Sequence, residues 1–272
     1  GAHSLPIEDI GVVILDSPQI LLSSALLSAM NENGVALVSC DARHMPCGVM
    51  TAFHPHSRQA EMAHLQTGWT APFRKRSWQY IVRGKITNQS ACLKRHNLDG
   101  WKHLESLVPK VKSGDPDNIE ARAARAYWTH LFDKKFKRRA DDSVNAALNY
   151  GYAIIRSCMA RSLVAYGFIP AFGIHHKNSL NAYNLADDLV EVLRPFVDDY
   201  VRENMDIFDE EDGLSRDMRR VLANIPNMQA DLRGEVFTLT NICDAMASGL
   251  GRAGREGKPD IMPVPEFIGG KI

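Results

Sequence analysis

Two adjacent histidines, His175 and His176, are followed by three acids at the start of a predicted helix. At about 100 degrees of turn per residue, Asp188 and Glu191 fall on adjacent turns beside a groove, whereas Asp187 points to solvent. Two carboxylates and an imidazole from the preceding loop can hold a divalent cation. Oxygen ligands suit Mg²⁺ or Mn²⁺, and one imidazole shifts the preference towards Mn²⁺. The spacing therefore allows a metal site split between a loop and a helix.

The same residues also have a structural interpretation that needs no metal. Acids in the first turns of a helix are stabilised by its macrodipole. The two histidines can be loop residues whose side chains hydrogen-bond to the backbone. Spacing alone leaves both interpretations open, because motifs this short often occur without the function.

A further acid, Glu120, lies in "DNIEARAARAYW" at the start of another predicted helix. The small alanines would let a neighbouring helix approach closely, which would bring this carboxylate towards a shared site. The pattern is also typical of a capping acid behind Asp117 or Asn118. Arg122 and Arg125 beside it would simply neutralise a buried carboxylate. Composition alone favours the structural role.

Basic residues interleaved with aromatic ones form two runs, "FRKRSWQYIVRGK" and "KKFKRR". Such runs suit a groove for a phosphate backbone, although charge runs are also common on solvated helix faces. The sequence contains no base-reading motif, so we expect nucleic-acid binding to depend on shape rather than on sequence. The candidates for phosphate contacts are Arg74, Lys75, Arg76, Lys137, Arg138 and Arg139.

The chain that must position these groups has 272 residues, of which 45% are hydrophobic, enough for a sizeable core in one large domain or two. The net charge is zero, but basic side chains concentrate in residues 73–103 and 120–139 and acids in residues 184–217. This separation indicates a polar molecule with one basic face. Five scattered cysteines without a CxxC pair indicate a reduced, cytoplasmic protein. No apolar run reaches the length of a membrane span, and no signal peptide is visible.

The pattern predicts an α+β fold that is mostly α. A small N-terminal β-rich domain is expected over residues 1–66 and a larger all-helical domain over residues 67–272. We expect strands in "IGVVILD", "GVALVSC" and "MPCGVMTAF", with a short helix between the first two. Two or three strands do not close a sheet well. Either strands that precede residue 1 are missing, or an edge of the sheet pairs with another copy of the protein.

Helices are expected throughout the remainder of the chain. Apolar spacing predicts one helix over residues 71–96 and another from about Ile119. A long helix should follow the second basic run. Asp142 or Ser143 would cap this helix, and Gly167 would stop it.

The helix that carries the three acids is expected over residues 184–204, with a kink at Pro195. One face of this helix should be buried, because it gathers Leu185, Leu189, Val192 and Phe196. The tail from residue 254 is rich in Gly and Pro and is expected to be extended or mobile.

Several long stretches occur in a fixed order and spacing after "LPIEDIGVVILD": "SWQYIVRGKITNQ", "IEARAARAYW", "NAALNYGYAIIRS" and "GFIPAFGIHHKNSLNAYNLADDLVEVLRPFVD". Together they resemble the CRISPR adaptation integrase, the Cas-one family, in its type II branch. The resemblance covers nearly the whole chain. Members of that family begin with a β-hairpin segment ahead of the "LPIEDIG" stretch, which this sequence lacks, so we expect a shortened β domain.

The resemblance implies an N-terminal β domain that forms homodimers and a helical domain that is a metal-dependent DNA endonuclease and integrase. It places the metal ligands at Glu120, His176 and Glu191, and adds Asp188 as a further catalytic acid close to the site. His175 falls one position before the family's histidine and is expected to be a neighbour rather than a ligand. The implied cofactor is Mg²⁺ or Mn²⁺.

The implied reaction is attack by the 3′-OH of a short DNA fragment on a phosphodiester at the edge of a CRISPR repeat. This step inserts a new spacer and serves antiviral defence. A metal would polarise the phosphoryl oxygen, and no protein nucleophile is needed. The implied partners are DNA and a Cas-two dimer that bridges two integrase dimers, joined in type II systems by the RNA-guided effector nuclease.

Two other functions fit some of the same residues. A helical metal-dependent phosphohydrolase acting on nucleotides also uses His and Asp ligands, but that class usually has an adjacent His-Asp pair where this chain has His175 and His176. A non-catalytic DNA-binding scaffold would carry a decayed site, whereas all three ligand positions hold competent side chains. Hydrolysis of nucleotides without DNA would favour the first alternative. Metal-independent DNA binding without strand joining would favour the second.

Overall fold

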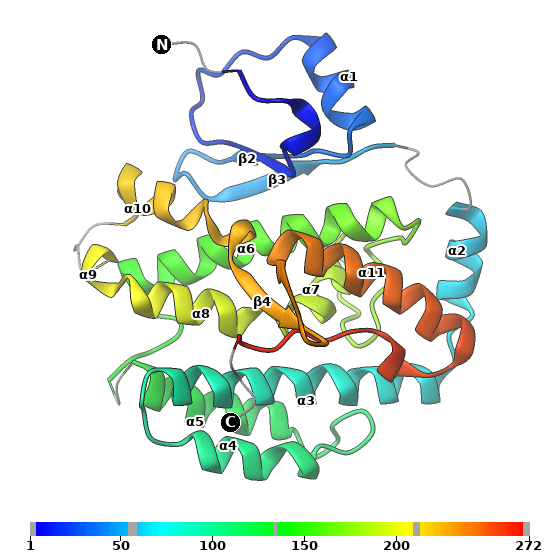
Figure 1. Ribbon diagram of the computed structural model, residues 1–272, viewed down its shortest axis with the longest axis vertical. Coiled ribbons are helices and arrows are strands. Elements are labelled where there is room, and N and C mark those ends of the chain that lie inside the picture. The colour runs from blue at the N-terminus through cyan, green and yellow to red at the C-terminus, as the bar shows by residue number, and fades with distance from the viewer. Residues whose placement is uncertain (1–3, 54–58, 133–134, 209–212, 269–272) are drawn as a thin grey trace.

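A small sheet lies over a larger helical part (Figure 1). The sheet contains β1 (Val12–Leu15), β2 (Ala36–Cys40) and β3 (Pro46–Met50), in the order β1-β2-β3. β1 is parallel to β2, with α1 (Ser24–Glu32) in the connection between them, and β3 returns antiparallel to β2. The three predicted strands and the helix between the first two are confirmed. The computed structural model describes residues 4–53, 59–132, 135–208 and 213–268.

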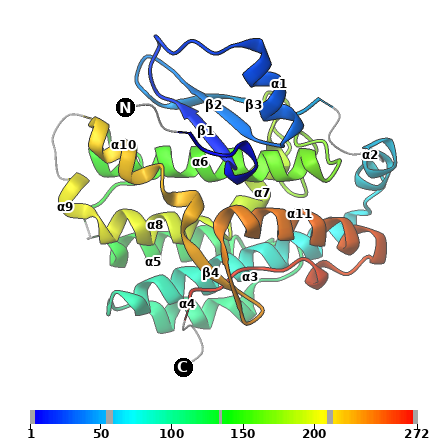
Figure 2. The same cartoon turned by 45° about the horizontal axis from the view of Figure 1, so that its top comes forward.

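Two long helices, α3 and α6, organise the helical part. The sheet packs on α6, which also contacts α7, α8, α10 and α11, while α3 packs against α4, α5 and α8. Figures 1 and 2 both show the sheet above α6. In both views α3 lies below α6, on the side away from the sheet. The described helices that follow the sheet are α2 (Gln59–Thr67), α3 (Ala71–Arg95), α4 (Trp101–Leu107), α5 (Ile119–Leu131), α6 (Ser143–Ala165), α7 (Asn184–Val190), α8 (Arg194–Glu203), α9 (Met205–Phe208), α10 (Arg216–Leu222) and α11 (Leu239–Glu256).

The predicted mostly α fold, with a small β region ahead of a larger helical part, is confirmed. The helical part also contains one unpredicted hairpin of β4 (Gln229–Leu232) and β5 (Glu235–Thr238). The boundary predicted between residues 66 and 67 falls inside α2, whose Met62 is buried in the main core. The position of the domain boundary stays a prediction. No described helix combines the length and hydropathy needed to cross a membrane.

Local signals explain where the two central helices begin and end. The Thr70 side chain accepts a hydrogen bond from Phe73 N at the start of α3. Asp142 accepts one from Asn145 N at the start of α6, at 2.7 Å, so Asp142 is the predicted cap. Gly167, which follows the end of α6, has a φ of 81°, a conformation that glycine adopts without strain.

The single kinked helix predicted over residues 184–204 is wrong, because the chain forms two helices there. α7 ends at Val190, turn residues follow, and Pro195 lies in the first turn of α8. A proline is tolerated at that position, since the N–H it lacks would have no partner inside the helix. Proline therefore begins a new helix instead of bending a continuous one, and Glu191 lies at the junction. The predicted apolar face is confirmed as buried at Leu185, Leu189, Val192 and Phe196.

The tail predicted to be extended or mobile from residue 254 begins with the last turn of α11 and a 3-10 turn at Pro259–Ile261, and only residues 263–267 are extended. Its described part is firmly packed rather than mobile. Glu266 bridges to Asp231 of β4, and the Phe267 ring stacks on Phe196 of α8 with centroids 4.3 Å apart. The buried Asn88 amide of α3 donates to Pro265 O at 3.0 Å and also to Val192 O at 2.9 Å. One side chain of α3 thus ties down both the tail and the α7–α8 junction.

We predict that Asn88→Ala lowers the free energy of unfolding by about 2 kcal/mol, because two buried carbonyl groups lose their donor. Urea denaturation measures the change. Asn227→Ala is the control, since that amide is exposed and bonds only locally, and we expect a change below about 0.5 kcal/mol. Equal effects of the two substitutions would show that Asn88 does not tie the elements together.

Two adjacent carboxyls of α8, Asp198 and Asp199, are buried against α3 and α6. Burial raises the pKa of each to about 7, despite hydrogen bonds from Tyr152 and Tyr127 to Asp198 and the Arg95 charge beside Asp199. Both pKa values lie above those of an unfolded chain. The protonated carboxyls therefore contribute their full stabilisation of the folded state below about pH 4. This contribution is lost as the pH rises through about 7.

We predict that the unfolding free energy of the protein falls between about pH 4 and 7, with each of these carboxyls adding up to about 1.4 kcal/mol per pH unit. Asp198→Asn should make this slope shallower, because an amide cannot ionise. Chemical denaturation at a series of pH values measures the slope. An unchanged slope in Asp198→Asn would show that the carboxyl is already ionised in the folded protein.

Candidate active site

Two of the predicted ligand residues meet at a lysine that was not predicted as part of the site. Lys85 of α3 is buried, and its ammonium donates to Glu120 Oε1 and to Glu191 Oε2. Glu120 comes from the start of α5 and Glu191 from the α7–α8 junction. Three elements distant in sequence therefore place two carboxylates around one cation.

The start of α5 shows why Glu120 is free to face this lysine. The Asp115 carboxylate accepts hydrogen bonds from Ile119 N at 2.9 Å and Glu120 N at 3.0 Å, so it satisfies the exposed end of the helix. Asn118 has a φ of 49° and makes no side-chain cap. The interpretation of Glu120 as a capping acid is wrong, because its carboxylate turns towards Lys85.

Asp188 is the anchor of the histidine loop. Its side chain is fully buried and accepts hydrogen bonds from the backbone N–H groups of Ile174, His175 and His176. It also contacts His176 Nδ1 at 2.7 Å. Gly173 permits this fold of the loop, since a Cβ there would lie 2.4 Å from His176 O. With its oxygens occupied in this way, Asp188 positions the loop and the imidazole and is poorly placed to bind a metal itself.

The two histidines have different surroundings. The His175 ring stacks on Trp78 of α3 with centroids 4.0 Å apart and an interplanar angle of 5°. Burial lowers the pKa of His175. His176 meets Trp78 edge-on, is partly exposed, and lines a pocket. The neutral ring with Nδ1–H donated to Asp188 carries its lone pair on Nε2, the arrangement found in metal-binding histidines. The assignment of His176 as the ligand stays a prediction, and the packing of His175 supports it.

The charges at the site keep the Glu191 carboxylate ionised. Burial alone would raise the pKa of Glu191, but the Lys85 and Arg194 cations outweigh burial and hold this pKa at about 2. Arg194 Nε lies 3.0 Å from Glu191 Oε1, as an ion pair without hydrogen-bond alignment. Burial would likewise lower the pKa of Lys85, and Glu191 and Glu120 raise it instead. The site is therefore a cluster of fixed opposite charges.

The donor set fits a divalent cation that prefers oxygen ligands. Glu120 and Glu191 already share one positive charge, the Lys85 ammonium, which stands where a metal would bind both carboxylates. His176 interacts electrostatically with Glu191, and its Nδ1 is held by Asp188. Two carboxylates and one imidazole match the preferences of Mn²⁺ and, with more water ligands, of Mg²⁺.

A second group, Cys92, His96 and Asp199, brings potential ligand atoms within 4.8 Å of one another. In this structure its polar atoms already contact one another and Arg95. His96 Nε2 and Arg95 Nε occupy the Asp199 oxygens at 2.8 and 3.3 Å. Burial and the Asp199 charge raise the pKa of Cys92 well above its usual range, so the thiol keeps its proton in this structure. We interpret this group as a buried polar contact between α3 and α8.

Asp187 does not point to solvent, so that prediction is wrong. Its oxygens accept hydrogen bonds from Arg156 Nε at 2.6 Å and from Asn181 Nδ2 at 2.6 Å. Arg156 belongs to α6, which packs across α7. A helix wheel of α7 alone could not reveal this partner, because it comes from a different helix.

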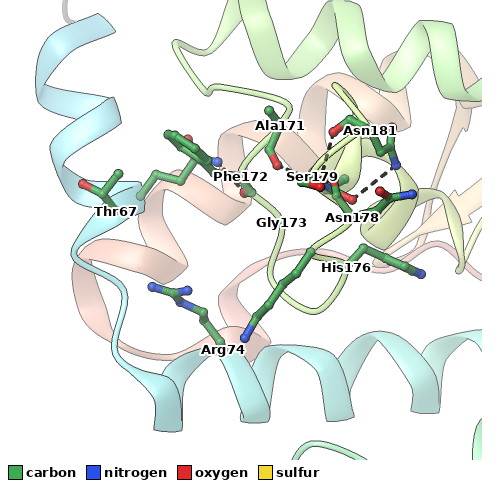
Figure 3. Close-up of a pocket in the computed structure, with 12 residues that line it drawn as sticks. Thr67, Arg74, Ala171, Phe172, Gly173, His176, Asn178, Ser179 and Asn181 are labelled. Carbon is green, nitrogen blue, oxygen red and sulfur yellow. Dashed lines mark hydrogen bonds between the residues drawn. The ribbon is translucent and has the colours of Figure 1, made fainter.

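Two pockets flank the histidine loop and share the cations Arg74 and Lys177. One, of about 410 Å³, includes His176, Phe172 and Asn184, and the other, of about 440 Å³, is lined by Lys75, Trp78 and His175. In Figure 3, Thr67 and Arg74 come from the α2–α3 segment and face the labelled loop residues across the first pocket. A positively charged depression therefore lies on each side of the histidine loop.

The six side chains predicted to contact phosphates differ in whether their donors already bond within the protein. Lys75, Lys137 and Arg139 are exposed, whereas Arg74 donates to Trp69 O and Arg76 to Gly257 O. The Arg138 guanidinium donates to Asn145 and Asn149, and it lies 5.6 Å from the Trp128 ring centroid. Arg138 therefore braces the start of α6, and the structure gives it a role inside the protein. Lys134 of the second run lies outside the described residues.

Lys85 is the site residue that sequence reasoning overlooked, although a signal for it exists. It falls on the same helical face as the buried residues Ile81, Val82 and Ile86. A charged residue on a buried face requires an opposite charge from elsewhere in the chain. Counting Lys85 among the basic residues of the "FRKRSWQYIVRGK" run concealed this requirement.

Relatives of the chain decide its family. A family model described as "CRISPR associated protein Cas1" matches residues 1–212. The CRISPR-associated endonuclease Cas1 of Neisseria meningitidis serogroup C (strain 8013) is 36% identical over 274 residues, covering 98% of this chain and 90% of the relative. The chain belongs to the Cas1 family. A second relative, the CRISPR-associated endonuclease Cas1 2 of Pyrobaculum aerophilum, is 26% identical over 229 residues, which cover 79% of this chain and 77% of the relative. The family predicted from the motifs is confirmed.

Solved structures share the fold of this Cas1-family chain. The structure described as "Casposase bound to integration product" superposes with a TM-score of 0.75 at 18% identity, over 92% of this chain and 80% of that chain. A chain of a Cas6-RT-Cas1–Cas2 complex superposes with a TM-score of 0.66 at 22% identity, over 89% of this chain and 31% of that chain. At these identities the likeness concerns the fold alone.

We predict that the His176 pKa lies above the ordinary value and that Asp188→Asn lowers it, because the hydrogen bond to Asp188 is the largest cause of the shift. A raised pKa in the folded state stabilises the protein below about pH 6.5, and this contribution is lost as the pH rises through the folded pKa. NMR titration of the His176 imidazole measures its pKa in the unaltered protein and in Asp188→Asn. Asp117→Asn, at an exposed carboxylate paired with Lys112, should leave the His176 titration unchanged. An equal pKa in Asp188→Asn and the unaltered protein would contradict the assignment.

Proposed function

We propose that this chain is a metal-dependent DNA integrase and endonuclease of CRISPR adaptation, which joins the 3′-OH of a short DNA fragment to a phosphodiester at the edge of a repeat. The observation that carries this proposal is the convergence of Glu120 and Glu191 on one cation position, with a histidine loop beside it. Membership of the Cas1 family and the naming of its relatives as endonucleases support the same reaction class.

Glu120, Glu191 and His176 would hold Mg²⁺ or Mn²⁺. When bound, the ion would supply electrostatic stabilisation of the charge that develops on the phosphoryl and leaving oxygens. Asp188 keeps His176 Nδ1 occupied, so that Nε2 is the nitrogen offered to the site. The chain's contribution is thus a rigid, pre-charged position for the reacting phosphate.

The reaction needs no protein nucleophile. The attacking 3′-OH forms a new phosphodiester bond with the repeat, the old P–O bond breaks, and the leaving strand ends in a new 3′-OH. Attack by water in place of the 3′-OH would give the endonuclease reaction. Arg74, Lys75 and Lys177 around the adjoining pockets are our candidates for holding the DNA phosphates near the carboxylates. Lys137 and Arg139, exposed ahead of α6, are candidates for a second stretch of backbone.

The partners are part of the proposal. Cas2 is expected to bridge two dimers of this chain, and the name of a Cas1–Cas2 complex with a similar fold supports that expectation. We propose that homodimers form through the N-terminal sheet. The outer edges of β1 and β3 pair with no other strand in the described chain, and Leu5 and Leu21 lie exposed nearby in sequence. The RNA-guided effector nuclease of type II systems remains a proposed partner on the resemblance alone.

The two alternative functions predict different behaviour. A nucleotide phosphohydrolase would use both histidines or a His-Asp pair, whereas His175 is stacked on Trp78 here. A scaffold would need Glu120 and Glu191 only as counter-charges of the buried Lys85, and it would not explain why Asp188 fixes the His176 imidazole through Nδ1. The integrase therefore explains more of the geometry than either alternative.

We predict that Glu120→Gln and His176→Ala each lower strand joining by at least about 100-fold, while DNA binding measured in EDTA is retained. The substrate is a branched DNA that mimics a half-integrated fragment, supplied with Mn²⁺ or with EDTA, and gel electrophoresis follows the resealed strand. Glu120→Gln keeps the size of the side chain and removes the charge that a metal requires.

The control is His175→Phe, which preserves the stack on Trp78 and removes the imidazole. Strand joining by this variant should stay within about threefold of the unaltered protein, because His175 is a packing residue. Normal joining by His176→Ala, or full joining in EDTA, would overturn the proposed function. Hydrolysis of free nucleotides without DNA would instead favour the phosphohydrolase.

A further inference from the structure

The surroundings of Lys85 go beyond what a three-ligand metal site requires. Its own helix supplies apolar neighbours, Ile81, Val82 and Ile86, so the ammonium depends on anions from α5 and from the α7–α8 junction. A buried ammonium without such partners is strongly unfavourable. Two buried carboxylates without a cation are unfavourable for the same reason. Lys85 thus stabilises the carboxylate pair in the absence of any metal.

The oxygens of the pair are divided among two different cations. Glu191 Oε2 faces Lys85, while Glu191 Oε1 faces Arg194, whose guanidinium is fixed 4.8 Å above the Tyr152 ring. Glu120 Oε1 faces Lys85. An ion that joins Glu120 Oε1 and Glu191 Oε2, the two oxygens that now face Lys85, would take the position of its ammonium, whereas Arg194 can stay in place.

The charge balance shows what such an exchange requires. Two carboxylates face two cations in this cluster, so it is neutral before a metal arrives. A divalent cation adds two positive charges and leaves the Lys85 ammonium without its anions. A DNA phosphate supplies negative charge to both the metal and the displaced ammonium. Lysine suits this role, because its charge sits at the end of a flexible stem of four carbons.

We propose that Lys85 is a displaceable internal cation that occupies the metal position in the resting protein and moves to a DNA phosphate when the metal binds, so that metal and DNA bind cooperatively. This inference rests on the proposed function and adds a regulation of the same site. Thermodynamic linkage makes the coupling reciprocal. DNA and metal therefore each strengthen the binding of the other by the same factor.

The test compares Mn²⁺ binding by the unaltered protein, Lys85→Met and Lys94→Met, each with and without a short branched DNA. The EPR signal of free Mn²⁺ gives the affinity and needs no catalytic turnover. Methionine matches the length of the lysine stem without its charge. Lys94 is the matched control, since it lies on the same helix, is exposed, and contacts the Trp101 ring rather than a carboxylate.

In the unaltered protein and in Lys94→Met, we expect DNA to tighten Mn²⁺ binding by about tenfold or more. In Lys85→Met, we expect Mn²⁺ to bind about tenfold more tightly without DNA and DNA to add less than about threefold, because the competing charge is gone. Equal Mn²⁺ affinity of Lys85→Met and the unaltered protein without DNA would overturn the displacement. An undiminished effect of DNA in Lys85→Met would overturn the coupling.

Two further measurements keep the proposal falsifiable. If Lys85→Met does not fold, Lys85→Gln removes the charge while its amide can still donate to a carboxylate, and the same affinities are expected. In crystals of the unaltered protein with Mn²⁺, Lys85 Nζ should have left both glutamates. Mn²⁺ bound at Glu120 and Glu191 with Lys85 still between them would overturn the inference alone. Mn²⁺ binding unaffected by Glu120→Gln would overturn the proposed function as well.

Discussion

The arrangement of the helical part depends on the pairing of buried charge at Lys85. An ammonium on the apolar face of α3 needs anions, and only residues from other helices can supply them. Glu120 and Glu191 meet this need and in return obtain a cation that lets them approach one another. The contact ties α5 and the α7–α8 junction to α3. The same three elements then present both carboxylates to one position.

The histidine loop is built around a second buried charge. Asp188 binds three backbone N–H groups and one imidazole nitrogen, so the loop after α6 closes on α7. Trp78 of α3 supports the loop from the other side through its stack on His175. The break between α7 and α8 places Glu191 next to Lys85 and Arg194 instead of inside a continuous helix. Each of these features stabilises the fold by itself, and together they give the proposed metal site its shape.

Much of this architecture was predictable from short-range patterns. The strands, the starts of α3, α5 and α6, and the buried face of α7 and α8 follow from spacing, caps and turn residues that lie near one another in sequence. Two errors have a common cause. Asp187 meets Arg156 from α6, and Glu120 meets Lys85 from α3, so neither partner is visible in the local sequence.

The candidate site itself came from the resemblance more than from the spacing. Local reasoning left the acids of α7 divided between a metal site and a helix N-terminus, and it placed Glu120 in a cap. Lys85 shows the limit most clearly, since its position on a buried face was readable but its partners lie 35 and 106 residues away. Long-range pairing of charges is a property of the fold, and the sequence pattern could only indicate that some partner was needed.

The central claim is that Glu120, His176 and Glu191 define one cation position beside Lys85. Fe²⁺, a substitute for Mn²⁺, can be bound at the site and treated with ascorbate and hydrogen peroxide, so that the radicals produced cut the nearby backbone. Mass spectrometry then identifies the fragments. The account predicts cuts near Glu120, near His176 and at the α7–α8 junction, all lost in Glu191→Gln. Cuts confined to the Cys92, His96 and Asp199 cluster, or cuts that persist in Glu191→Gln, would contradict it.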